Sequence, residues 1–531
     1  FLGARLNVVE NVRKGYGSNF GWAYGEAPVV FNKRNTTEPA AFPWKRCVDA
    51  LYLDYDRLYG NGIEVREGDR GAYKLEQNEK VQLVNLLNEQ NTSLRLGFEE
   101  KLDIDLHRYD DAAIRERLSR ERYDVVGLGN LVSSYKVTKH ITAMVREEQP
   151  QARIVVGNTV ASIPRQLLSW NPQIDFAVIG EGERTMLELL EALRGLRSLA
   201  SVDGLAFRED GAVVVNRPRE AIPRMEDIPF PDYSLFEIEK YLAVSYYCIG
   251  EPHPKPREEM RTLPINTARG CVFDCTFCYH AFKGNKYRAY PFSMVLDFYG
   301  RLQDAYGINY LNFWDELTIL NKARLVELCD AVEASGREVY WSISPRGNTF
   351  TRKDLPLLKR ARSLGALTIG GALETSSPEI LRAMNKKITP EAFIEQAQTA
   401  GEAGLTPQTS LVFGFPQETP ETIRDTVETC RKAGVYPSAG FLLPLPLTQI
   451  YDQARASGRI EADEEAYLLR IGDRQDLHVN LTAMSDAELT DTVKSELRGL
   501  KQALGIDTGG EDTLRTTIYR AARKGAAAHD A

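Results

Sequence analysis

The stretch 269–279 reads Arg-Gly-Cys-Val-Phe-Asp-Cys-Thr-Phe-Cys-Tyr and follows an apolar segment, 263–267, that we predict to be a strand. It places Cys271, Cys275 and Cys278 on one loop in a C-x3-C-x2-C pattern. Three thiolates this close together in the sequence can bind a common metal centre. An iron–sulfur cube has four iron corners, so three cysteines would leave one iron open to a small molecule.

Strands and helices are predicted to alternate on both sides of this loop, from residue 263 to residue 443. The predicted strands are 263–267, 308–313, 338–342, 366–369, 409–413 and 439–443, and helices such as 293–305, 322–334, 390–401 and 420–433 fall between them. Six strand–helix units fit an open, partial version of the eight-unit α/β barrel. Because the chemistry of such barrels lies at the carboxyl ends of the strands, the cysteine loop is predicted to be part of a site.

A shorter alternating series, 95–195, precedes the barrel. Its predicted strands are 101–106, 123–128, 153–156 and 176–179, with helices at 112–118, 135–148, from 164 and at 185–196. Short strands separated by helices indicate a doubly wound parallel sheet. Ligands of such sheets also bind at the carboxyl ends of the strands. A hairpin at 203–217 and a proline-containing linker at 222–233 follow this series.

The composition is that of an ordinary globular chain. Of 531 residues, 43% are hydrophobic and 26% are charged, which argues against a disordered protein, a collagen or a coiled coil. The net charge of −8 gives no general attraction to nucleic acid. No run of about 18 apolar residues occurs, so no membrane span is expected. The start of the chain does not resemble a signal peptide, and we expect a reducing, cytoplasmic location.

The triad, with Phe277 before its last cysteine, resembles the signature of the radical S-adenosylmethionine (SAM) enzymes, and the resemblance covers residues 260–455. It implies that the three cysteines hold a [4Fe–4S] cluster whose open iron binds SAM. It further implies that one electron cleaves SAM to a 5′-deoxyadenosyl radical, which abstracts a hydrogen atom from the substrate. A zinc ion and a buried structural triple are the alternatives for the triad. Zinc would need a fourth protein ligand, and His280 is too near in the sequence to be an easy one.

Several segments at predicted strand ends are similar to the SAM-binding segments of that family. They read Phe-Trp-Asp-Glu at 313–316, Ser-Pro-Arg at 344–346, Gly-Gly-Ala-Leu-Glu-Thr-Ser at 370–376 and Gly-Phe-Pro-Gln-Glu-Thr at 414–419. The resemblance implies SAM contacts from Phe277, Asp315, Glu316, Ser344, Arg346, Glu374, Ser376, Gly414 and Pro416. Leu447 stands where relatives often have the glycine of a P-G-T segment.

The segment 95–195 resembles the cobalamin-binding domain that precedes many radical SAM barrels. Each of the stretches 123–130, 154–159 and 179–183 is a predicted strand that runs into a glycine-containing loop. The implied cobalamin contacts are Gly127, Asn130, Ser133, Ser134, Gly157, Thr159, Gly180, Glu181 and Gly182. The stretch 105–110 nearly matches the D-x-H-x-x-G motif that supplies a histidine to cobalt, but Asp110 replaces its glycine. We therefore predict His107 to be a structural or surface histidine and the cobalt to have no protein histidine ligand.

These resemblances give the predicted fold class: α/β, with a doubly wound parallel-sheet cobalamin-binding domain, then a partial (β/α)6 TIM-like radical SAM barrel and a helical C-terminal tail. The expected regions are an atypical N-terminal segment, 1–75, that would hold the first strand of the cobalamin domain plus an insertion; the cobalamin domain, 76–200, with a helix at 76–91; the hairpin and linker, 201–255; the barrel, 256–455; and the tail, 456–531.

The resemblance implies a methyltransferase that moves a methyl group from methylcobalamin to an unactivated carbon. The alternative keeps both cofactors and performs a cyclisation, a ring contraction or a carbon–carbon coupling. Two further alternatives are a non-catalytic metal or corrinoid carrier and a tRNA methylthiotransferase, whose extra cluster cysteines this sequence does not show. The expected partners are a small-molecule, lipid or natural-product substrate and an electron donor such as flavodoxin or ferredoxin, without nucleic acid.

The remaining cysteines are scattered. Cys329 and Cys430 lie on predicted helices and are expected to be small buried apolar side chains. Cys47 has no predicted role, and Cys248 lies close ahead of the barrel. Three aromatic residues near the triad are expected either to pack or to line the pocket: Tyr279, Phe282 and Tyr287.

Overall fold

The computed structural model describes residues 109–120, 122–245, 249, 253–279, 282, 284–472 and 474–506. The predicted N-terminal segment 1–75, the helix at 76–91 and the strand at 101–106 lie outside these residues. So do Cys47, His107, Cys248, His280 and the end of the tail from residue 507.

The first sheet is built as the alternating pattern predicted. The described elements are α6 (Asp111–Arg120), β1 (Val125–Gly129), α7 (Tyr135–Glu148), β2 (Arg153–Gly157), α8 (Pro164–Trp170), β3 (Phe176–Val178), α9 (Gly182–Leu193), β4 (Leu205–Glu209) and β5 (Ala212–Val215). Strands β1, β2 and β3 are parallel neighbours, and β4 joins the edge of β3 in the antiparallel direction. The predicted hairpin is therefore part of this sheet rather than of the linker. Asp210 and Gly211 make its turn with positive φ angles of 49° and 82°, as a tight hairpin turn requires.

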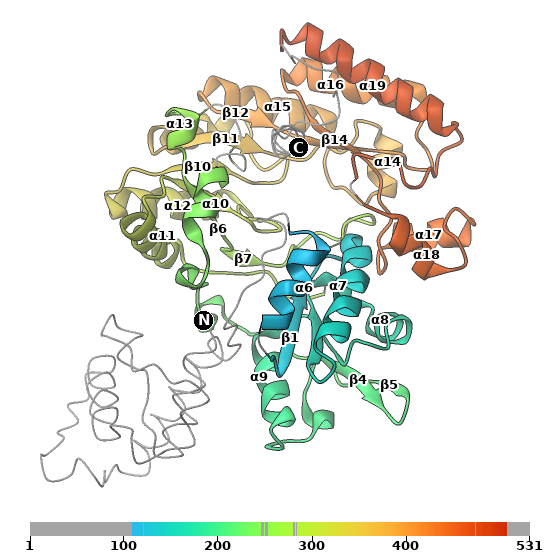
Figure 1. Cartoon of the computed structure of the whole chain (residues 1–531). Coiled ribbons are helices and arrows are strands. Elements are labelled where there is room, and N and C mark those ends of the chain that lie inside the picture. The colour runs from blue at the N-terminus through green and yellow to red at the C-terminus, as the bar shows by residue number, and fades with distance from the viewer. Residues whose placement is uncertain are drawn as a thin grey trace, which may run out of the picture.

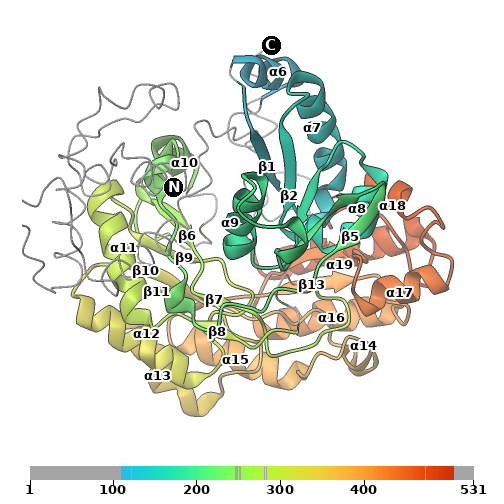
Figure 2. The same cartoon turned by 90° about the horizontal axis from the view of Figure 1, so that it is seen from below.

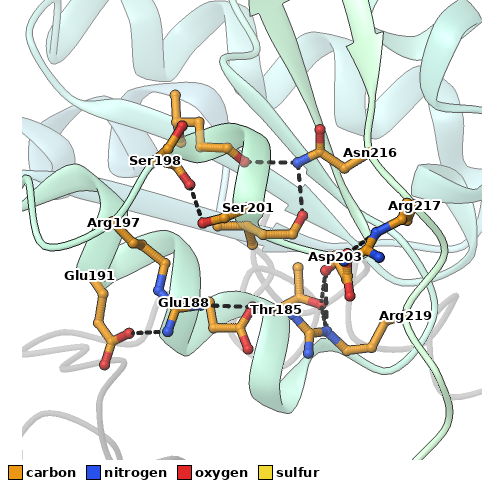
Figure 3. A network of polar contacts seen from close by, with 12 residues as sticks. Thr185, Glu188, Glu191, Arg197, Ser198, Ser201, Asp203, Asn216, Arg217 and Arg219 are labelled. Carbon is orange, nitrogen blue, oxygen red and sulfur yellow. Dashed lines mark hydrogen bonds and ion pairs between the residues drawn. The ribbon is translucent and has the colours of Figure 1, made fainter.

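A network of polar contacts fastens the hairpin to α9 (Figure 3). Thr185 on α9 donates its hydroxyl to the carbonyl of Asp203 at 2.9 Å. Glu188 on the same helix forms an ion pair with Arg219, which follows β5. These contacts lie within the first domain, so they stabilise its edge.

The second sheet forms the wall of the predicted barrel. Its strands are β6 (Thr262–Ile265), β9 (Tyr310–Phe313), β10 (Tyr340–Ile343), β11 (Ala366–Gly370) and β12 (Thr406–Gln408), and a separate parallel pair, β13 (Ser410–Phe413) and β14 (Ser438–Phe441), continues the wall. A single bridge between Glu374 and Leu411 connects the two groups. The sheet order β6-β9-β10-β11-β12 follows the chain order, as in a barrel.

Helices cover the outside of this wall (Figure 2). They are α11 (Phe292–Tyr306), α12 (Lys322–Ser335), α13 (Leu355–Ser363), α15 (Pro390–Glu402) and α16 (Pro420–Ala433), and the long helix α19 (Asp486–Ala503) lies against α16 (Figure 1). The described part of the tail is thus largely helical, as predicted. No helix among the described residues is long and apolar enough to cross a membrane.

The two domains share one apolar core. Buried residues of the first domain, such as Leu167 and Leu168, belong to the same cluster as Phe415 and Tyr467 from the second. The helices α17 (Gln449–Ala456) and α18 (Glu464–Arg470) follow the barrel, and α18 packs on α7. At that contact the Tyr135 hydroxyl donates to Glu465 at 2.5 Å. Because burying apolar surface is strongly stabilising, this interface holds the domains in one arrangement.

Candidate functional site

Two short antiparallel strands, which we call the ribbon, connect the two ends of the cysteine loop to the barrel. Strand β7 (Ala268–Arg269) pairs with β8 (Arg288–Ala289), so the triad lies in the loop between them. The short helix α14 (Pro378–Ala383) anchors this loop. The carbonyls at its C-terminal end accept two hydrogen bonds from Thr276, one from its amide and one from its hydroxyl. The Thr276 carbonyl in turn accepts the amide of Ile450 at the start of α17. These anchors fix the loop without using its thiols.

The three thiols are half-buried and lie close enough to interact electrostatically. Burial, together with the neighbouring Cys275 and Cys271, raises the pKa of Cys278 to about 12. Burial raises the pKa of Cys271 as well. Thiolates in such surroundings need a cationic centre to stabilise them, and an iron cluster supplies one.

The donor set of the loop is three thiols. A structural zinc ion normally takes four protein ligands, so three thiols alone are one ligand short. A zinc ion needs its sulfur ligands at about 2.3 Å from one centre. A cube takes each cysteine at a different corner, so the donor set fits a [4Fe–4S] cluster.

The Asp315 carboxylate stabilises the segment that leads into the cysteine loop. Its carboxylate accepts the Thr267 and Ala268 amides at 2.6 Å and 3.0 Å and the Thr318 hydroxyl at 2.9 Å. Burial raises the pKa of this carboxyl, against the hydrogen bonds that lower it. We predicted Asp315 to contact SAM. In the structure its carboxylate oxygens accept hydrogen bonds from the segment that leads into the cysteine loop. Glu316 beside it is exposed and interacts electrostatically with Cys271.

Arg346 lines a pocket next to the loop and carries two unused donors. Its guanidinium carbon lies 3.8 Å from the centre of the Phe273 ring, between two of the cysteines in sequence. Its Nε and one terminal nitrogen are buried without a hydrogen-bond partner. Both residues line a cavity of about 440 Å³ that extends to the start of α12. Unpaired buried guanidinium donors are costly unless an acceptor occupies the pocket, so the site fits a carboxylate.

The Ser344 carbonyl, at the end of β10, accepts the Ile319 amide at 3.2 Å. Glu374 lies at the end of β11, buried and in the left-handed conformation with φ of 66°. Its carboxylate forms an ion pair with Lys386 at 2.8 Å, and its negative charge raises the pKa of Cys278. Ser376 instead lies against α16, where its amide and hydroxyl contact the Thr426 hydroxyl.

The fifth-strand segment shapes the far side of the site. Gly414 has a φ of 106°, which favours glycine, and its amide donates to Glu418 at 3.3 Å. Pro416 is exposed. Phe277 packs edge-on against Phe415 with ring centres 5.9 Å apart, so this segment also supports the triad.

The carboxyl edge of the first sheet is open around its glycines. A Cβ atom added at Gly129, Gly157 or Gly180 would meet no atom within 4 Å. The open space beside these glycines would let a flat ligand approach the backbone closely. Asn158 next to Gly157 has φ 64° and ψ −159° and accepts the Thr159 amide on its side chain.

The other predicted cobalamin contacts surround this edge. Gly127 is exposed within β1, Ser133 and Ser134 lie in the turn before α7, and Gly182 begins α9. Asn130 donates its side chain to Thr138 at 3.0 Å, and the Thr159 hydroxyl accepts the Val132 amide at 2.8 Å. These two side chains hold the loops in place.

Glu181, at the predicted cobalamin edge, pairs with the barrel through its side chain. Its carboxylate lies 2.6 Å from Arg288 and 3.2 Å from Arg269, the two arginines of the ribbon. Tyr279, directly after the triad, donates its hydroxyl to the Thr159 carbonyl at 3.1 Å. The sequence reasoning missed the arginines, although their positions on either side of the cysteine loop were a usable signal.

Comparison with known proteins agrees with both domains. The Radical SAM superfamily matches residues 265–430, and the B12 binding domain matches residues 92–190. An uncharacterized methyltransferase of Pyrococcus horikoshii is 30% identical over 337 residues, which cover 63% of this chain and 70% of the relative. The anaerobic magnesium-protoporphyrin IX monomethyl ester cyclase of Rubrivivax gelatinosus is 26% identical over 326 residues, which cover 60% of this chain and 56% of the cyclase.

The fold is also that of a solved enzyme. The radical SAM methyltransferase TsrM from Kitasatospora setae, with cobalamin and a [4Fe–4S] cluster bound, superposes with a TM-score of 0.53 over 71% of each chain, at 20% identity. In this chain the B12 binding domain thus precedes the Radical SAM domain. The chain belongs to the cobalamin-dependent radical SAM enzymes, whose cofactors are a [4Fe–4S] cluster, SAM and cobalamin.

Proposed function

We propose that the protein is a methyltransferase that places a methyl group on an unactivated carbon of a small molecule. The observation that carries the proposal is the contact between Tyr279, which ends the cysteine loop, and the Thr159 carbonyl at the cobalamin edge. It joins the cysteine loop to the loop after β2, and with both cofactors on these loops one substrate would be within reach of both. The methyltransferase relative from Pyrococcus horikoshii supports the same reaction.

The cofactors supply the chemistry: SAM and the cluster supply the radical that removes hydrogen, and cobalamin carries the methyl group. The protein's part is binding and orientation. Arg346 would hold the SAM carboxylate with its two unpaired donors. Glu374 would accept hydrogen bonds from the ribose, held in place by Lys386. Gly414 would let backbone approach the adenine.

We keep the remaining expectations as part of this proposal. Cobalt would have no protein histidine ligand; His140, for example, pairs on the surface with Asp111 at 2.9 Å. A one-electron donor such as flavodoxin or ferredoxin would reduce the cluster, and no nucleic acid would take part. Because a cluster with an open iron is sensitive to oxygen, a reducing cytoplasm suits the enzyme.

The second candidate function is a cyclisation with the same cofactors. The cyclase relatives favour it, and the chain spans just over half the length of the one from Rubrivivax gelatinosus. Product mass separates the two functions. Methylation adds one methylene unit to the substrate, whereas a cyclisation or ring contraction does not.

The test is anaerobic reconstitution with iron, sulfide, SAM, hydroxocobalamin and a strong reductant, followed by mass analysis of candidate substrates. Cys275→Ala should lose cluster iron and stop forming 5′-deoxyadenosine. Cys430→Ala is the matched control, because Cys430 is fully buried on α16 and outside the loop. Full activity of Cys275→Ala would show that the cluster lies elsewhere, and products without the added methylene would replace methyl transfer by the second function.

A further inference from the structure

A buried ion-pair network joins the cobalamin edge to the stem of the cysteine loop. The side chain of Glu181 is 3% exposed, and those of Arg288 and Arg269 are 8% and 17% exposed. Arg269 also pairs with Glu183. The other oxygen of Glu181 accepts the Ile222 amide at 2.7 Å, and Arg288 donates to the Ile222 carbonyl at 2.5 Å. One carboxylate thus joins three segments of the chain.

These residues lie where the loop after β3 and the two ends of the cysteine loop meet. Glu181 lies between Gly180 and Gly182, in the loop at the carboxyl end of β3. Arg269 and Arg288 are paired partners across the ribbon, at the point where the cysteine loop begins and ends. A shift of the cobalamin loop relative to the triad would therefore stretch the ion pairs directly.

A second contact acts on the other end of the cysteine loop. Tyr279 lies one residue beyond Cys278, and its hydroxyl contacts both the Thr159 carbonyl and the Ser162 hydroxyl. Thr159 and Ser162 belong to the short turn after β2, which is the loop next to Gly157. Two loops of the first sheet are thus each tied to a different part of the cysteine loop.

Buried charge pairs are a poor way to gain stability, because desolvation offsets much of their attraction. Their best-established advantage is to specify one arrangement over its neighbours. We propose that Glu181 is a positioning residue which, with Tyr279 as the second contact, holds the cobalamin loops at a constant distance from the cysteine loop and so sets the separation of cobalt and cluster. This inference rests on both cofactors occupying these loops, and not on which product is formed.

The first experiment uses the full chain without cofactors. Glu181→Gln keeps the size of the side chain and removes its charge. We expect faster hydrogen–deuterium exchange in peptides around residues 179–184 and 268–289, with little change elsewhere. Glu188→Gln is the matched control, because Glu188 pairs with Arg219 and Arg197 inside the first domain (Figure 3). Unchanged exchange across the interface in Glu181→Gln, or the same interface response in Glu188→Gln, would overturn the inference.

The second experiment uses enzyme loaded with cluster and hydroxocobalamin and poised with dithionite at a potential where the cluster is reduced and the cobalt is still cob(II)alamin. EPR measures the magnetic interaction between cob(II)alamin and the reduced cluster, which depends on their separation. We expect this interaction to weaken or broaden in Glu181→Gln and, to a smaller extent, in Tyr279→Phe. An interaction identical to that of the wild type in both variants would overturn the inference, even if activity fell.

Two substrate-independent reactions of the loaded enzyme separate positioning from general damage. Reductive cleavage of SAM to 5′-deoxyadenosine needs only the barrel. Methylation of cob(I)alamin by SAM needs both domains: the carbon–sulfur bond breaks, a cobalt–carbon bond forms with the electron pair of cobalt, and S-adenosylhomocysteine leaves.

In Glu181→Gln we expect the second reaction to fall about 10- to 100-fold, as a misplacement near 1 Å can cause, and the first to persist. A parallel loss of both reactions would mean that the variant is only destabilised and would overturn the positioning role. If wild-type enzyme shows the cofactor coupling but methylates no substrate, the proposed function fails and the inference stands.

Discussion

Glu418 carries a carboxyl group into the protein interior at the start of α16. It is 2% exposed and accepts the Thr422 hydroxyl at 2.7 Å and the Gly414 amide at 3.3 Å. Burial raises the pKa of this carboxyl from 4.5 to about 7, although both hydrogen bonds lower it. The folded protein therefore holds this proton more tightly than the unfolded chain does. Its contribution to stability is present below about pH 4.5 and is lost as the pH rises to about 7.

Glu418→Gln should remove this pH dependence. Between pH 5 and pH 8 the wild type should lose on the order of 2–3 kcal/mol of unfolding free energy relative to the variant. Urea denaturation of the cofactor-free protein at several pH values measures it. Glu421→Gln, which changes an exposed carboxylate in the first turn of α16, should follow the wild type. Parallel curves for wild type and Glu418→Gln would contradict the prediction.

Asn158 occupies a conformation that few residues other than glycine adopt, with φ 64° and ψ −159°. Its side chain compensates by accepting the Thr159 amide at 2.7 Å. Asn158→Ala keeps the strain and loses this bond, so it should cost about 1–2 kcal/mol. Asn158→Gly relieves the strain and should stay close to the wild type. Denaturation midpoints check the order, and an alanine variant as stable as the glycine variant would argue against strain.

At the scale of elements, the turn between α13 and β11 depends on a glycine. Gly365 has a φ of 97°, and a Cβ atom there would lie 2.0 Å from the Val339 carbonyl oxygen. The backbone approaches closely because the Gly365 carbonyl accepts the Trp341 amide and so continues the pairing of β10 with β11. The close approach is thus set by the register of the sheet.

Gly365→Ala should destabilise the protein by about 3 kcal/mol or more. Gly336→Ala is the comparison, because Gly336 ends α12 with φ of 61° and has open space around it. It should cost only about 1–2 kcal/mol, the price of a left-handed alanine. Thermal and urea denaturation measure both, and equal losses would show that the close contact is relieved by a small backbone shift.

For the whole molecule, the shared core predicts that the two domains lose structure together. Phe415 follows β13 in the barrel, is 1% exposed, and belongs to the cluster that contains residues of α7 and α8. Phe415→Ala should cost about 3–5 kcal/mol. It should also raise hydrogen exchange in α7 and α8, although the substitution lies in the second domain.

Leu489→Ala provides the control. Leu489 on α19 is fully buried in a different cluster, formed by the second half of the barrel and α19. Its substitution should raise exchange mainly in α16 and α19. If Phe415→Ala left α7 and α8 unchanged, the domains would be energetically independent despite their contact.

The sequence by itself determined the local features. Strand and helix periodicity predicted the parallel strands that the structure describes, because that periodicity reports which face of each element is buried. The fifth barrel strand was the exception, since it is split into β12 and β13 by a shift between partners. The cysteine spacing identified the triad, because all three thiols lie on one loop. Asn158, and Leu447 at a position where the resemblance implies glycine, both have positive φ angles, of 64° and 71°.

Only the tertiary structure decided how side chains at the strand ends are used. Asp315, Ser376 and Glu181 are all predicted to contact cofactors, and the structure shows their side chains bound to other parts of the protein. Glu181 meets Arg288 across 107 residues of sequence and a domain boundary. Such a contact depends on how the two sheets pack through their shared core. The local sequence pattern carries no information about which residues that packing brings together.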